Sequence, residues 1–125
     1  MDFETAAALC RTFPGCTEDI KWGACRVFSV GLKMFAVTDS DTPATRFSFK
    51  VDDDRFLELT DRSDIIPAPY MARLKWVSVE KPTALSDEEA AQLLRQAYDL
   101  IFAKLSKKLQ REISAAQGTE QGEHA

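Results

Sequence analysis

The chain has 125 residues, of which 45% are hydrophobic and 29% are charged, and its formal net charge at pH 7 is −4. These values are typical of one globular domain rather than of a disordered chain, and the acidic balance counts against a dedicated nucleic-acid-binding protein, which usually has a basic domain. No apolar run approaches the roughly 20 residues that span a bilayer, so we expect no membrane contact.

The residues that usually carry catalysis are scarce. The cysteines Cys10, Cys16 and Cys25 form no C-x-x-C pair, and the single histidine, His124, stands beside the last residue. A terminal imidazole is poorly placed for nucleophilic catalysis, and no phosphate-binding glycine loop or metal-ligand spacing is found. We therefore expect no enzyme, with no catalytic residue, metal site or cofactor. The start MDFETAAALC has no secretory signal, which favours reduced thiols in a cytoplasmic protein.

The first half of the chain predicts a helix followed by strands. Residues 3–12 carry apolar side chains at helical spacing, and Pro14 and Gly15 end the helix. Gly31 separates two alternating runs as a hairpin turn does, and residues 39–43 are a polar loop. The expected strands are 19–22, 25–30, 33–37 and 45–51.

The strand at 45–51, TRFSFKV, alternates cleanly. Phe47 and Phe49 point to one face, whereas Arg46 and Lys50 point to the other. The aspartates at 52–54 suit the first turn of a helix that continues to about residue 62, with Phe56, Leu57 and Leu59 as candidates for its buried side. A cation site at these aspartates is the weaker reading, because three adjacent carboxylates cannot all face one ion.

The stretch IIPAPYMARLKWVSVE, residues 65–80, combines stiff residues with an alternating run. Pro67 and Pro69 cannot donate to a ladder, which predicts an extended edge or connector before the next strand. We expect Tyr70 to pack against the domain and the strand LKWVSVE to be partly covered on both faces, with Trp76 in the core.

The last element is predicted as one long helix. Ser86 and Glu89 form a capping box, and apolar residues then recur at spacings of three and four as far as Ile113. Residues 114–125 contain no bulky apolar side chain and are expected to be disordered. The domain, residues 1–113, is therefore a two-layer α+β fold, an antiparallel β-sheet packed against helices in the order α-β(3-4)-α-β(1-2)-α.

Several local signatures in this order resemble the MmcQ/YjbR family of small bacterial proteins. The resemblance covers roughly residues 3–106. It rests on FPGCTED (13–19), WG (22–23), VFSVGLKMFAV (27–37), FSFKVD (47–52), IIPAPYMARLKWVSV (65–79) and QAYDLIFAKL (96–105).

The resemblance implies an α+β fold related to the type III secretion chaperone topology, also described as a double-wing, frataxin-like DNA-binding fold. It implies function less strongly, because nucleic-acid binding by the family is inferred mainly from the fold. Two positions depart from the family pattern: Lys75 stands where histidine is common, and Ala97 where serine is common.

The predicted strands and the segments beside them carry a candidate DNA-binding face. Its basic residues are Lys33, Arg46, Lys50, Arg73 and Lys75. The candidates for base stacking or for a pocket are Trp22, Tyr70 and Trp76. The alternatives are a solvated strand face, on which the stem of Lys33 is partly covered while its ammonium reaches water, a module that binds a protein partner or a second copy of itself, and a small-ligand binder with a pocket around Trp76, Tyr70 and Lys33.

Overall fold

The computed structural model describes the backbone of residues 1–39 and 44–124 and the side chains up to residue 116, apart from residues 40–43. Of the polar loop predicted at 39–43, only Asp39 lies within the described residues. The helices are α1 (Phe3–Arg11), α2 (Asp53–Thr60), α3 (Asp87–Phe102) and α4 (Lys107–His124), with two short 3-10 helices, η1 (Ala72–Leu74) and η2 (Pro82–Ala84). The strands are β1 (Cys16–Lys21), β2 (Cys25–Val30), β3 (Lys33–Asp39), β4 (Phe47–Lys50), β5 (Ile65–Pro67) and β6 (Trp76–Val79).

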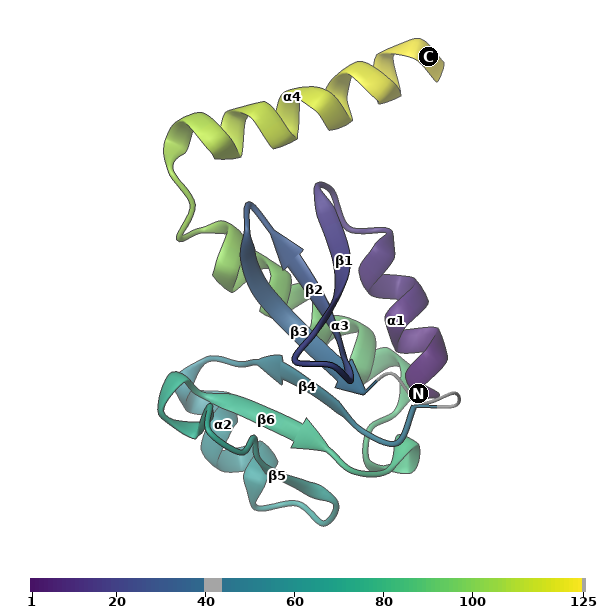
Figure 1. Ribbon diagram of the computed structural model, residues 1–125, viewed down its shortest axis with the longest axis vertical. Helices are drawn as coiled ribbons and strands as arrows, with labels where there is room; N and C mark the ends of the chain where they lie inside the picture. The colour runs from purple at the N-terminus through teal and green to yellow at the C-terminus, as the bar shows by residue number, and fades with distance from the viewer. Residues whose placement is uncertain (40–43, 125) are drawn as a thin grey trace.

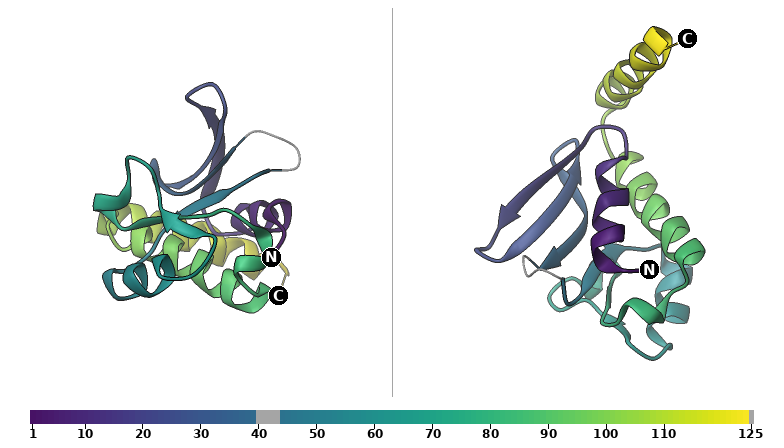
Figure 2. Two further views of the ribbon diagram at one scale, coloured as in Figure 1. Left: turned by 90° about the horizontal axis from the view of Figure 1, so that it is seen from below. Right: turned by 90° about the vertical axis from the view of Figure 1, so that its right-hand side faces the viewer.

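The six strands form one antiparallel sheet in the order β1-β2-β3-β4-β6-β5. Helices α1 and α3 lie against one face of this sheet, and α2 lies on the same side beneath β5 and β6 (Figures 1 and 2). The predicted α+β fold with an antiparallel sheet is therefore confirmed. The proline-rich segment is the short edge strand β5, as expected for residues that cannot donate to a ladder.

The core lies between the sheet and α1 and α3. Phe28 and Phe47 stack with ring centroids 6.1 Å apart, and Tyr98 of α3 meets the edge of Phe35 at 5.5 Å. The hydroxyl of Tyr98 donates to the carbonyl of Pro14, which ties α3 to the turn after α1. Aromatic packing and one buried hydrogen bond thus fix the two main helices to the sheet.

Local caps explain where several helices begin. Asp52 and Ser86 accept hydrogen bonds from the backbone of Arg55 (2.8 Å) and Glu89 (3.1 Å), at the starts of α2 and α3. The aspartates at 52–54 therefore act in helix capping, as predicted. Only half of the predicted capping box forms, because the Glu89 carboxylate pairs with Arg62 at 2.7 Å.

The prediction of one long final helix was wrong. Helix α3 ends at Phe102 and α4 begins at Lys107, after a break at residues 103–106. Ser106 accepts a hydrogen bond from the backbone of Leu109 at 3.1 Å and so caps α4. The break lets Leu105 and Leu109 turn onto Gly31, whose position would place a Cβ only 2.7–2.8 Å from their methyl groups.

Helix α4 extends into residues 114–125, the segment predicted to be disordered. Its backbone continues as far as His124. Ile113 is partly buried against the core, whereas residues 114–116 are exposed. That the domain needs nothing beyond residue 113 remains a prediction.

Two further expectations about packing were wrong. The strand LKWVSVE begins only at Trp76, because residues 72–74 form η1 and Lys75 has a left-handed backbone with φ 61°. Leu74 and Leu57 are exposed, at 61% and 73%, instead of buried. Leu59 is the buried residue of α2 in place of Leu57, and Leu74 lies in η1 instead of on the strand.

Candidate functional site

Basic side chains fall into two structural groups. Six of the 16 basic residues form ion pairs with carboxylates: Arg11, Arg26, Arg55, Arg62, Lys81 and Arg95. The other ten form no such pair with the described carboxylates. The positive charge available to a ligand is therefore in this second group.

Most of the second group gathers at one end of the sheet. Lys33 begins β3 and Lys50 ends β4, and because these neighbours are antiparallel, both lie at the same end. Lys75 directly precedes β6, whose first residue pairs with Lys50, and Lys104 follows α3. Figure 1 shows the end of β4, the start of β6 and the end of α3 on the left-hand side of the molecule. We name as the basic end these four lysines together with the cations that lie near them in the sequence, Arg73, Lys107 and Lys108.

Lys50 is a partly buried member of the basic end, as is Lys75. Its Nζ donates to the carbonyl of Leu74 at 2.6 Å, which leaves two donors free. Burial lowers the pKa of Lys50, and the charges of Lys104 and Lys75 lower it further, against the opposing effect of Asp53 and Asp52. Lys50 thus lies within electrostatic range of cations from two other segments of the chain. An anion placed among them would relieve their repulsion.

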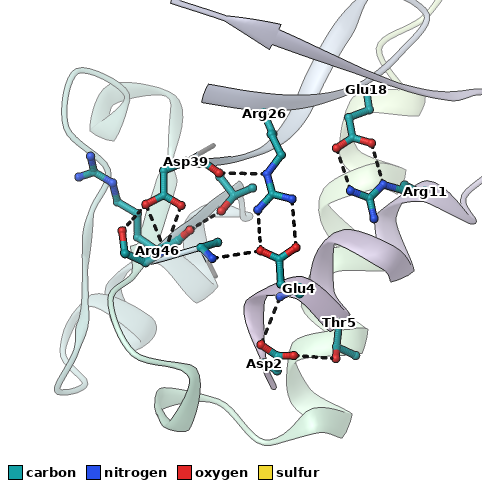
Figure 3. Close-up of polar contacts among 11 residues, drawn as sticks. Asp2, Glu4, Thr5, Arg11, Glu18, Arg26, Asp39 and Arg46 are labelled. Carbon is teal, nitrogen blue, oxygen red and sulfur yellow. Dashed lines mark hydrogen bonds and ion pairs between the residues drawn. The ribbon is translucent and has the colours of Figure 1, made fainter. Parts of the chain in front are cut away.

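Arg46, a predicted member of the basic face, lies elsewhere. It precedes β4, and its neighbour Thr45 donates a backbone hydrogen bond to Asp39 at 3.0 Å, at the opposite end of β3 from Lys33. The alternation predicts one side of the strand for Arg46 and Lys50, but Arg46 precedes β4, and four residues of extended chain separate the two by about 13 Å. Figure 3 shows the guanidinium of Arg46 pointing away from the Glu4–Arg26 pair.

The three aromatic candidates do not come together. Trp22 is 67% exposed in the turn after β1. Tyr70 is fully exposed in the loop after β5, so the prediction that it packs against the domain was wrong. As β1 and β5 are the two edges of the six-stranded sheet, about 24 Å of sheet lies between them. Trp76 is only 2% exposed, so it is a core residue as predicted and cannot stack on a ligand.

The alternative pocket around Trp76, Tyr70 and Lys33 was also misplaced, since the first is buried and the other two are exposed. Lys33 as a whole is exposed, which agrees with an ammonium that reaches water. A small apolar cavity of about 20 Å³ lies instead on the helix-covered face, lined by Phe3, Phe47 and Leu94 among others. This volume has room for about one water molecule.

Two searches of the described part of the chain gave negative results. No group of three or more histidine, cysteine or acidic side chains is arranged to hold a metal ion. None of the helices searched has the length and apolar character needed to cross a bilayer.

The two departures from the family pattern have different environments. The backbone of Lys75 is in the left-handed region. Its Nζ lies 5.0 Å from the ring centroid of Phe56, which makes a cation–π contact with α2. Ala97 is completely buried on α3, where it packs in the core. Of these two residues, only Lys75 contributes to the surface, where it adds a cation to the basic end.

Sequence reasoning missed Lys104, Lys107 and Lys108 as site residues. Their position at the end of a helical pattern suggested a role with the helix dipole. The sequence feature that could have identified them is Ser106, which stands between Leu105 and Lys107 and is of a residue type that caps helices. A helix break at Ser106 brings the start of α4 to the turn that precedes Lys33.

Comparison with known proteins gives one family and two similar structures. The YjbR family model matches residues 11–100. A crystal structure of a Deinococcus radiodurans protein with a DUF419 domain is 28% identical, with a TM-score of 0.79, covering 90% of this chain and 88% of that one. A Pseudomonas syringae protein is 18% identical, with a TM-score of 0.65 over 81% of this chain and 99% of that one, a likeness that concerns the fold alone. No match is found among curated proteins.

Proposed function

The chain belongs to the YjbR family, and from the arrangement of its basic residues we propose that it binds the phosphate backbone of a nucleic acid, without sequence preference and without catalysis. The observation that carries the proposal is the basic end: seven lysine and arginine side chains from four segments, none ion-paired with a described carboxylate.

The separation of paired and unpaired cations supports this function despite the acidic total charge. Arginines on the helix-covered side, such as Arg26 and Arg62, are neutralised by carboxylates at 2.7 Å. Lysine at the basic end is a compact point charge suited to phosphate. A local cationic surface can attract a polyanion even on an acidic protein, over about one Debye length of 8–10 Å. Binding should consequently be weak and strongly salt-dependent.

Fluorescence anisotropy with a labelled duplex over a range of salt concentrations tests the proposal. Each phosphate contact should add about 0.9 to the slope of log affinity against log salt. The double variant Lys33→Glu, Lys104→Glu should weaken binding and lower the slope by about 1 for each lost contact. Both side chains are exposed, so the denaturation midpoint should stay near that of the wild type.

A matched control comes from the opposite end of the sheet. Lys21→Glu, Arg46→Glu changes the net charge by the same amount at two exposed residues outside the basic end. Equal loss of affinity in both double variants would indicate a response to total charge and would refute a defined site. Absence of binding at low salt would remove the nucleic-acid function.

The second candidate, a module that binds a protein or a second copy of itself, is favoured by one feature. Strand β1 is a six-residue edge strand with five exposed residues, and Ile20 on it is 59% exposed. Such an edge can add a strand from a partner. Sedimentation of the wild type and of the Ile20→Lys variant tests self-association. The wild type should sediment as a dimer and the variant as a monomer.

A further inference from the structure

Tyr70 combines two unfavourable features. Its side chain is fully exposed, and its backbone is left-handed with φ 66°. A left-handed backbone is strained for a residue that has a Cβ, and an aromatic ring in water contributes no burial to the fold. Trp22 shares both features, so what sets Tyr70 apart is its position beside the basic end.

The backbone around Tyr70 is held firmly. Ala68 donates to the carbonyl of Trp76 at 3.0 Å, Met71 donates back to Ala68 at 3.1 Å, and Leu74 donates to Met71 at 3.1 Å. The prolines on either side of Ala68 restrict φ further. The ring is therefore presented by a loop that is organised before any ligand arrives.

This loop adjoins the basic end. The Nζ of Lys50 donates to the carbonyl of Leu74, so one of the cations is attached to the loop itself. Arg73 and Lys75 belong to the same turn, and Leu74 is 61% exposed. An exposed aromatic ring and an exposed apolar side chain thus belong to the same short segment as two cations, and a third cation is hydrogen-bonded to its backbone.

We propose that Tyr70 stacks on an unpaired base while Lys50 and its basic neighbours hold the adjacent phosphates, so that the protein prefers single-stranded to double-stranded nucleic acid. The inference rests on the proposed phosphate-binding function and adds the class of nucleic acid. Bases inside a duplex are already stacked on their neighbours, whereas an unpaired base offers its face to an aromatic ring.

Anisotropy with a labelled oligothymidine strand and with a labelled mixed-sequence duplex, both at low salt, tests the inference. The wild type should bind the single strand more tightly. Tyr70→Ala should weaken single-strand binding about 5- to 150-fold, the range for one stacked base, and should leave duplex binding nearly unchanged. Tyr70→Phe and Tyr70→Trp should retain the preference because they keep an aromatic face.

Trp22→Ala is the matched control, because Trp22 is also an exposed aromatic residue with a left-handed backbone, at the far edge of the sheet. It should bind both probes as the wild type does. Equal binding of the two probes, or a Tyr70→Ala variant that retains the single-strand preference, would overturn the stacking role while leaving the phosphate function standing. Binding of neither probe would overturn both.

Discussion

Removing the charge of Glu4 should show how much the polar contact between α1 and the sheet contributes to the free energy of unfolding. The Glu4 carboxylate accepts two hydrogen bonds from Arg26 of β2, at 2.7 and 3.1 Å, and one from the backbone of Ala44, at 3.0 Å (Figure 3). The hydrogen bonds from Arg26, followed by that from Ala44, lower the pKa of Glu4 from 4.5 to about 2. Glu4→Gln removes the charge but keeps the size of the side chain.

The magnitude follows from the pKa and the exposure. A lowering from 4.5 to about 2 corresponds to about 3 kcal/mol of folding free energy. The Glu4 side chain is 35% exposed, although that of Arg26 is only 12% exposed, so solvent screening reduces the expected cost of Glu4→Gln to about 1–2 kcal/mol at pH 7.

The sign of the pH dependence is fixed by the direction of the pKa change. Because the folded-state pKa of Glu4 is lowered, its contribution is present above pH 4.5 and is lost as the pH falls toward about 2. The difference between the wild type and Glu4→Gln should thus have fallen by more than half at about pH 3.

Urea denaturation of both proteins between pH 7 and pH 3 measures this difference. Asp99→Asn is the control, since the Asp99–Arg95 pair spans one helical turn with both side chains more than half exposed, and its loss should cost at most about 0.5 kcal/mol. A Glu4→Gln effect that is no larger than the control, or that does not change with pH, would refute the reasoning.

Three other changes test the packing, two by chemical denaturation and one by thermal denaturation. Trp76→Ala should cost about 3–5 kcal/mol, because the indole is 2% exposed; a midpoint near that of the wild type would contradict its core position. Gly31→Ala should cost about 1–3 kcal/mol, because the new Cβ would lie 2.7 Å from a methyl group of Leu105 and the φ of 57° is unfavourable for alanine. An unchanged midpoint would show that Leu105 and α4 can shift at little cost. Deletion of residues 114–125 should leave the melting temperature unchanged, and a fall of several degrees would show that the tail stabilises the domain.

Much of the fold could be predicted because it follows from local chemistry. The alternation of Phe47 and Phe49 identified the buried face of β4, and Ser86 marked the start of α3. Prolines placed β5 at an edge of the sheet, where a missing donor costs nothing. Each of these properties depends on residues within one or two turns of one another.

The candidate site was predicted less well because it is assembled from distant segments. Lys33, Lys50 and Lys75 were identified from sequence as basic residues on strands or beside them, but Arg46 was included and Lys104 was missed. Which strand ends coincide depends on the antiparallel order of the sheet and on the break between α3 and α4. No local pattern carries that information.

The sequence by itself determined the α+β class, the helix caps, the edge position of the proline segment and the burial of Trp76. Tertiary structure alone decided that Tyr70 is exposed, that Arg26 and Arg62 are neutralised and that the lysines gather at one end. The physical reason is range: backbone preference and amphipathic period act between near neighbours, whereas the net charge of a surface depends on which carboxylates the fold brings to which cations.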